Sequence, residues 1–171
     1  MHLTNFEFKA AVKDLAALEK KLLTLKPVFI GEDNQIDTYF NVLKGRLKLR
    51  EGNIENSLIF YEREDVAQAK ESDVLLYKYQ PAPPLKEILV KVHGVKVIVK
   101  KKRKIYFIKN VKFHFDTVEH LGTFVEVEAI DDSGYTNIEE LKKQCIKYAD
   151  FFGIKSSDYI SVSYSDLILQ G

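Results

Sequence analysis

Asn5-Phe6-Glu7-Phe8-Lys9, near the start of the chain, places polar residues two apart with phenylalanines between them. In a β-strand, residues i and i+2 point to the same face, so Glu7 and Lys9 lie on one face and the two phenylalanines on the other. One such strand is ordinary, because many sheets have one solvated and one buried face. The fold is decided by the recurrence of this alternation elsewhere in the chain.

Other stretches repeat the alternation and keep charges of one sign together. Arg46, Lys48 and Arg50 alternate with leucine, whereas Glu126 and Glu128 alternate with valine. Like charges two apart on one strand face repel each other, so the pattern indicates an anion bound beside the basic group and a cation beside the acidic one. Further pairs two apart are Tyr61 and Arg63, Lys101 and Arg103, and His114 and Asp116. This distribution predicts a β-barrel with a charged interior.

A metal-bound polyphosphate would satisfy both groups of charges. Arginine offers forked donors to phosphate oxygens and lysine a compact charge. Glutamate carboxylates are hard ligands that suit Mg²⁺ or Mn²⁺. The competing interpretation of each single strand is a solvated outer face, and a lone histidine such as His114 is more often structural than a ligand or a base.

Lys100-Lys101-Lys102-Arg103-Lys104 resembles a nucleic-acid or nuclear-targeting run. On a strand, however, Lys101 and Arg103 face one side and the other three lysines face the opposite side. We favour two inward and three solvated charges, because no nucleic-acid-binding motif or stacking platform accompanies the run.

Composition restricts the class of protein. The chain has 171 residues, 46% hydrophobic and 30% charged, with a net charge of +1, which fits a single domain over residues 1–171 with a real core. Cys145 is the one cysteine, so neither a disulfide framework nor a cysteine metal cluster is expected. No apolar run is long enough to span a membrane and no signal peptide is evident, so we expect a cytoplasmic protein that binds neither membrane nor nucleic acid.

Hydrophobic periodicity and turn residues predict strands interspersed with three or four helices. A capping box at Thr136 to Glu139 predicts a helix that ends near Phe152, before Gly153. We expect strands over 3–11, 28–41, 46–51 and 56–64, with three or four more within 95–130. Residues 65–73 are expected to form an exposed loop, and further helices are expected over 12–25, 84–92 and about 156–169.

Taken together, these motifs resemble the CYTH superfamily of triphosphate tunnel metalloenzymes, in its class IV adenylyl cyclase-like branch. The family signature Glu-x-Glu-x-Lys corresponds to the stretch from Asn5 to Lys9. The other matching stretches, in order, are Asp37-Thr38-Tyr39-Phe40, Leu47-Lys48-Leu49-Arg50, Tyr61-x-Arg63, Lys101-x-Arg103, His114-x-Asp116-x-Val118, Leu121-Gly122-x-Phe124-x-Glu126-x-Glu128 and Ser163-Tyr164-Ser165-Asp166-Leu167. The resemblance implies an α+β, β-dominated fold: a closed, mostly antiparallel eight-stranded barrel with helices outside.

The resemblance also implies roles for individual residues. The implied triphosphate ligands are Lys9, Lys48, Arg50, Tyr61, Arg63, Lys101 and Arg103, with Arg46 added by strand parity; of these, Lys9, Arg63 and Arg103 are the expected catalytic residues. The implied ligands of Mg²⁺ or Mn²⁺ are Glu7, Asp116, Glu126 and Glu128, with Asn5 as a further candidate. Asn5 departs from the signature, because a neutral amide replaces its first carboxylate and is the weaker ligand.

The implied activity is a metal-dependent reaction on a triphosphate-bearing small molecule. The first expectation is a cyclase that converts ATP to cyclic AMP and pyrophosphate. A triphosphatase acting on inorganic, thiamine or nucleoside triphosphate is the alternative, and a non-catalytic triphosphate- or polyphosphate-binding protein is the second alternative. The sequence is compatible with a homodimer as well as with a monomer.

Overall fold

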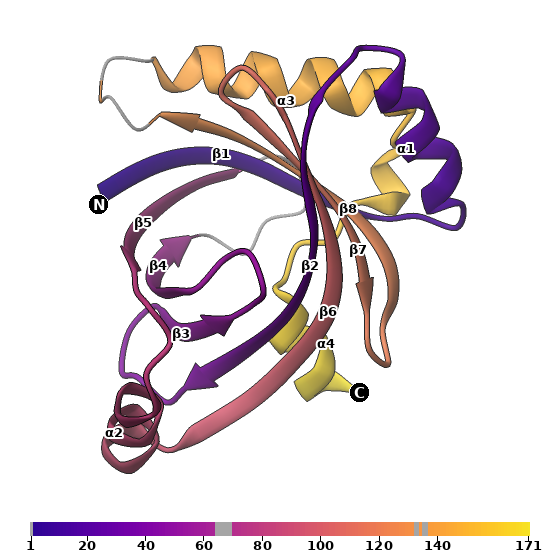
Figure 1. Ribbon diagram of the computed structural model, residues 1–171. Helices are drawn as coiled ribbons and strands as arrows, with labels where there is room; N and C mark the ends of the chain where they lie inside the picture. Colours follow the sequence, from indigo (N-terminus) through magenta and orange to yellow (C-terminus); the bar gives the residue numbers. More distant parts are fainter. Residues whose placement is uncertain (1, 64–69, 132–133, 135–136) are drawn as a thin grey trace.

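Eight antiparallel strands form a closed barrel in the computed structural model (Figure 1). The structure describes residues 2–63, 70–131, 134 and 137–171, and for residues 2, 3, 63 and 70 it describes the backbone alone. The order around the barrel is β1-β5-β4-β3-β2-β6-β7-β8. The strands are β1 (His2–Ala11), β2 (Val28–Phe40), β3 (Arg46–Glu51), β4 (Ser57–Arg63), β5 (Lys70–Lys78), β6 (Val95–Ile108), β7 (Val111–Val118) and β8 (Gly122–Asp131). The predicted fold class is confirmed.

The barrel closes where the first strand meets the last. β1 pairs with β8 from Thr4 opposite Asp131 to Ala11 opposite Phe124, and this register sets Lys9 opposite Glu126. The phenylalanines of β1 are buried on the outer side of the barrel wall, as the alternation requires. The polar residues of the same strand therefore point into the lumen.

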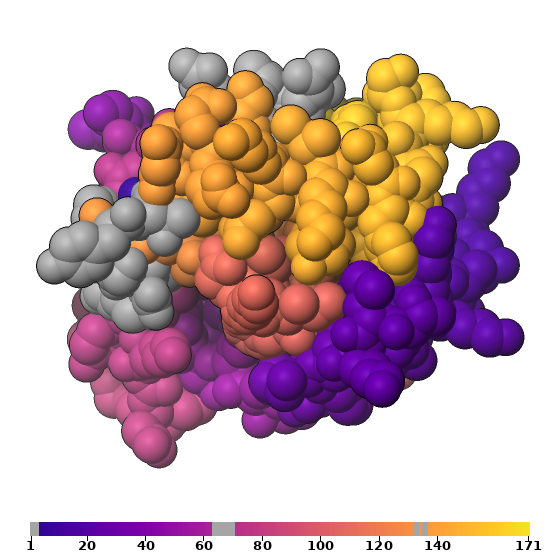
Figure 2. Space-filling view, turned by 90° about the horizontal axis from the view of Figure 1, so that it is seen from above, coloured from indigo at the N-terminus to yellow at the C-terminus, as the bar shows by residue number. Residues whose placement is uncertain are grey.

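Helices lie on the outside of the barrel, and over β1, β6, β7 and β8 they bury the apolar residues that alternate with the lumen charges. The helices are α1 (Leu15–Leu23), α2 (Pro83–His93), α3 (Ile138–Phe152), the 3₁₀ turn η1 (Ser156–Asp158) and α4 (Tyr164–Gln170). The main core lies beneath α3, where Leu141 and Cys145 pack against strand residues such as Phe8, Phe113 and Val127. In Figure 2, atoms of α3 (orange) lie beside atoms of the C-terminal segment (yellow) on the face that is shown.

Three expectations about local structure need correction. Residues 70–73 are not part of a loop but begin β5, where Ser72 is buried and faces the lumen; a polar sequence is tolerated there because the lumen itself is polar. Residues 65–69 of that expectation lie outside the described part. The first helix is shorter than 12–25, because Asp14 caps it and Val12 still bonds to Thr123 of β8.

The segment expected as one helix over about 156–169 is divided in two. Ile160 donates its backbone N–H to the carbonyl of Lys9, which keeps residues 159–160 extended along β1. A new helix then begins at Tyr164, with Ser163 and Asp166 forming a reciprocal capping box. The interruption positions α4 against β6 and directs Tyr164 toward the lumen.

Candidate functional site

The barrel encloses a cavity of about 790 Å³, which side chains from all eight strands line. This volume lies within the range of small-molecule sites. Basic side chains outnumber acidic ones along the described lining, so the cavity as a whole favours an anion. The predicted residues that line it are Asn5, Glu7, Lys9, Lys48, Arg50, Tyr61, Lys101, Arg103, Glu126 and Glu128.

Two other predicted residues, Arg46 and Asp116, do not join this lining, and the side chain of a third is not described. Arg46 forms an ion pair with Asp166, N to O 2.9 Å, and borders a separate small depression of about 80 Å³. Asp116 is fully buried behind Arg103. The side chain of Arg63 lies outside the described residues, although its backbone ends β4 opposite Ser72.

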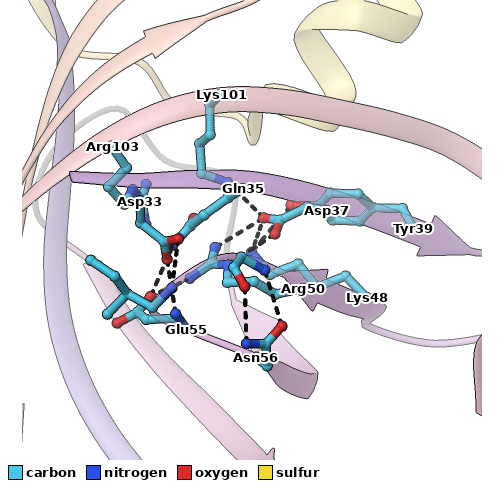
Figure 3. A network of polar contacts seen from close by, with 12 residues as sticks. Asp33, Gln35, Asp37, Tyr39, Lys48, Arg50, Glu55, Asn56, Lys101 and Arg103 are labelled. Atoms are coloured by element: carbon cyan, nitrogen blue, oxygen red, sulfur yellow. Dashed lines mark hydrogen bonds and ion pairs between the residues drawn. The ribbon is translucent and has the colours of Figure 1, made fainter. Parts of the chain in front are cut away.

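Asp37 is the centre of the basic cluster (Figure 3). Its carboxylate accepts hydrogen bonds from Lys48 at 3.1 Å, from Arg50 at 2.8 and 2.9 Å, and from Lys101 at 2.7 Å. Burial opposes ionisation of Asp37, but the three cations hold the pKa of this carboxyl well below its usual range. One carboxylate thus holds three phosphate-binding candidates together in the absence of ligand.

Glu55 extends from the β3–β4 hairpin into the same cavity (Figure 3). It accepts hydrogen bonds from Arg50 and Gln35, both at 3.1 Å, and also from Lys112 of β7. Asp33 fixes the hairpin by accepting the backbone N–H groups of Ile54 and Glu55, both at 2.9 Å. Glu55 therefore connects two walls of the barrel through ion pairs.

Asp116 positions Arg103. The two residues are joined by two hydrogen bonds, Nε to Oδ1 at 2.7 Å and an amino nitrogen to Oδ2 at 2.6 Å, and Tyr164 donates its hydroxyl to Oδ2 at 2.7 Å. Arg103 also donates to Glu126 at 3.1 Å. Both oxygens of Asp116 are thereby occupied, and this geometry gives no support to its predicted role as a metal ligand.

The pKa of Lys101 is low for a lysine. Burial is the largest cause, Arg50 and Arg103 act in the same direction and the carboxylate of Asp37 opposes them, and the resulting pKa is about 7. The charge of Lys101 therefore depends on pH in the neutral range.

An acidic cluster occupies the wall formed by β1, β8 and β7. Glu7 lies opposite Glu128 in the register, and His114 lies opposite Glu126. Ligand atoms of His114, Glu126 and Glu128 lie within 4.8 Å of one another. Burial and the neighbouring Glu126 raise the pKa of Glu128 to about 8, whereas Lys9 and Arg103 hold the pKa of Glu126 well below its usual value despite burial.

The donor set of this wall fits a divalent cation. Carboxylate oxygens are suitable ligands for Mg²⁺ or Mn²⁺. The amide oxygen of Asn5, on the same strand as Glu7, is buried and accepts no hydrogen bond from any described residue, so an acceptor is available beside the carboxylates. A cation would also relieve the repulsion among the carboxylates.

Sequence reasoning missed several lining residues. Lys112 and His114 share strand parity, so the same alternation that indicated His114 could have indicated Lys112. Asp37 and Tyr39 belong to a motif that the resemblance quoted, but the motif alone assigned them no role. Glu55 lies in a hairpin, outside any periodic pattern, and no signal in the sequence points to it.

The fold and this site define a triphosphate-tunnel type of protein. The CYTH domain model matches residues 3–164, and the chain belongs to the CYTH domain family. A search of curated proteins finds no significant match. No helix in the described part of the chain is both long and apolar enough to cross a membrane.

Solved structures agree with this fold. A conserved hypothetical protein from Pyrococcus furiosus is 26% identical, with a TM-score of 0.79 and 95% of this chain and 99% of that chain covered. A candidate adenylate cyclase from Vibrio parahaemolyticus is 18% identical, with a TM-score of 0.79 and coverage of 96% and 97%. A candidate adenylyl cyclase from Hippeastrum, described as having a dominant triphosphatase activity, is 14% identical, with a TM-score of 0.62 and coverage of 99% and 94%.

Proposed function

We propose that the barrel binds a nucleoside triphosphate together with a divalent cation and catalyses a reaction at one of its phosphorus atoms. The observation that carries the proposal is the convergence of five cationic side chains on one cavity whose adjoining wall is acidic. Those cations are Lys9, Lys48, Arg50, Lys101 and Arg103. Phosphoryl chemistry depends mainly on positioned phosphates and compensated charge, and this cavity is built from groups that supply both.

The arginines and lysines have complementary tasks in this proposal. Arg50 and Arg103 are each held by two carboxylates, so their remaining N–H donors are oriented before a phosphate arrives. The lysines add compact positive charges that can pair with the successive phosphate groups. A divalent ion on Glu7, Glu126 and Glu128 would neutralise charge on the phosphate oxygens and on the leaving group.

Cyclisation of ATP is our first assignment. The ribose 3′-hydroxyl oxygen attacks the α-phosphorus and loses its proton to water, the bond from that phosphorus to the bridging oxygen breaks, and pyrophosphate leaves. The order of motifs from Asp37 to Phe40 and from His114 to Glu128 supports it, and the cavity has room for a nucleoside beside the triphosphate.

Hydrolysis is the second assignment, because water can attack the terminal phosphorus in the same cavity to release orthophosphate. The triphosphatase activity described for the Hippeastrum protein favours keeping it. The third assignment, binding without turnover, has its support in the neutral Asn5 at a position where the family signature has a carboxylate.

Product analysis tests the proposal. The protein is incubated with ATP, GTP, thiamine triphosphate or tripolyphosphate and with Mg²⁺ or Mn²⁺, and the products are separated by chromatography. Cyclic AMP with pyrophosphate supports cyclisation, whereas ADP with orthophosphate reassigns the protein to the triphosphatases. Ligand-induced thermal stabilisation without product supports binding alone, and neither stabilisation nor product refutes the proposal.

Two variants serve as a matched pair in this assay. Glu128→Gln removes a carboxylate from the acidic wall and is expected to abolish turnover. Glu119→Gln changes an exposed glutamate in the β7–β8 turn and is expected to leave turnover unchanged. Equal activity of both variants would exclude Glu128 from the reaction.

A further inference from the structure

His114 has a feature that the proposed function does not use. Its side chain lines the cavity from β7 and is only 1% exposed, yet neither ring nitrogen has a hydrogen-bond partner among the described residues. A buried polar group without a partner is costly, and native proteins contain few of them. A structural histidine would use at least one nitrogen to hold its ring, so this one is poorly explained by a structural role.

The surroundings of His114 supply the rest of a coordination set. Its Nδ1 lies 3.7 Å from Oε1 of Glu128, too far for a hydrogen bond, and Glu126 lies directly opposite on β8. Ligand atoms of the three residues all lie within 4.8 Å of one another. Asn5 contributes to the same cavity a buried amide oxygen that has no partner in the described part of the chain. Two independent observations, unpartnered polar atoms and clustered carboxylates, therefore point to one ligand.

The dimensions allow one ion to bind this set. Metal–nitrogen and metal–oxygen bonds are about 2.1 Å long, so ligand atoms on opposite sides of an ion lie about 4.2 Å apart. The 4.8 Å within which these ligand atoms lie exceeds 4.2 Å by about 0.6 Å, which side-chain rotation can close. Of the two carboxylates, Glu126 is already paired with Arg103.

We propose that His114 is a nitrogen ligand of the divalent cation, so that the site is a mixed nitrogen and oxygen site selective for Mn²⁺, Co²⁺ or Zn²⁺ over Mg²⁺. Imidazole suits transition ions, whereas Mg²⁺ prefers oxygen ligands and retains its water. The neutral side chain of Asn5 also disfavours Mg²⁺, because it gives the site less negative charge than a carboxylate would, and a hard ion binds best to charged oxygen ligands. The inference rests on the metal dependence in the proposed function and adds the identity of one ligand and the class of ion.

Pulsed electron paramagnetic resonance of bound Mn²⁺ tests the inference directly. The full chain is loaded with Mn²⁺ alone, without nucleotide, in unlabelled form and with ¹⁵N-labelled histidine. We expect nitrogen modulation that changes with the label in the wild-type protein and in His120→Gln, which alters an exposed histidine of the β7–β8 turn. We expect no histidine nitrogen signal in His114→Gln. Bound Mn²⁺ without histidine coupling in the wild-type protein would overturn the inference, and this result does not depend on a variant that folds.

Calorimetric titration supplies a second readout. His114→Gln is expected to lose affinity for Zn²⁺ or Co²⁺ by at least about tenfold, the lower end of what even an outer-shell partner costs, while Mg²⁺ affinity changes little. Equal loss for all ions, or no loss for any, would contradict the proposed selectivity. Circular dichroism of each variant confirms that the barrel is folded.

The outcomes separate this inference from the proposed function. Histidine coupling without turnover of any triphosphate would sustain the ion site and refute the enzyme. Turnover with Mn²⁺ but without histidine coupling would sustain the enzyme and refute His114 as a ligand.

Discussion

Replacing Asp37 with asparagine should weaken the fold and strengthen anion binding at the same time. The carboxylate is 1% exposed and holds Lys48, Arg50 and Lys101 through hydrogen bonds of 2.7–3.1 Å. Asp37→Asn keeps the shape of the side chain but leaves these cations without their shared partner. Removal of one partner from a buried ion pair costs about 3–5 kcal/mol, which for a chain of this size lowers the melting temperature by roughly 6–20 °C.

The same substitution removes the group that competes with phosphate for the three cations. We therefore expect Asp37→Asn to bind tripolyphosphate more tightly than the wild-type protein, by on the order of tenfold. Saturating tripolyphosphate should then restore most of the lost thermal stability. The assays are differential scanning calorimetry with and without tripolyphosphate, and isothermal titration calorimetry.

Glu62→Gln is the matched control. Glu62 forms a salt bridge of 3.1 Å with Lys44 on the outside of the barrel, where the lysine side chain is 81% exposed. Exposed pairs contribute about 0–1 kcal/mol, so its melting temperature and its phosphate affinity should change little. If Asp37→Asn melted like this control, or bound tripolyphosphate more weakly than the wild-type protein, the view of Asp37 as an internal substitute for phosphate would be wrong.

Three further predictions concern other parts of the lumen. Asn5→Glu should lower the Mn²⁺ concentration needed for half-saturation in a thermal-shift titration, because it adds a carboxylate beside Glu7; an unchanged titration would remove Asn5 from the ion site. Gly52→Ala should cost about 1–3 kcal/mol in urea unfolding, because a Cβ there would lie 2.5 Å from a carboxylate oxygen of Asp33; wild-type stability would show that the hairpin adjusts freely. Tripolyphosphate affinity should fall as the pH rises from about 7 to 9, because Lys101, with a pKa of about 7 in the free protein, must take up a proton when phosphate binds. Lys101→Arg should flatten that profile, since arginine stays charged, and a profile identical to wild type would show that another group titrates.

The alternation of polar and apolar residues predicted which side chains face the lumen, because the geometry of a β-strand fixes the direction of each side chain. Once Phe6 and Phe8 are buried outside, Glu7 must point inward. The same logic placed Lys101 and Arg103 inside and the flanking lysines of their run outside. The closed eight-stranded architecture was predicted from the family resemblance. The alternation along a strand shows which residues share a face of that strand, but it does not give the number of strands in the barrel.

The partners of each charge were not predictable in the same way. Parity gave Asp116 an inward direction, but its full pairing with Arg103 depends on a register between β6 and β7 that the sequence does not reveal. Glu55 reaches the lumen from an irregular hairpin, which Asp33 fixes from a different strand. Such contacts join residues distant in sequence, and local patterns carry no information about them.

The pairing of β1 with β8 has a consequence for how the chain folds. This seam joins the first and last strands, so it cannot form until the chain has been synthesised through residue 131, and non-local pairing of this kind slows folding. Until then β1 and β8 each present an open edge, on which another chain could pair. Strand β1, which carries Glu7, and strand β8, which carries Glu128, pair only at this step. The acidic wall is therefore assembled last, and a barrel that binds the metal has also completed its folding.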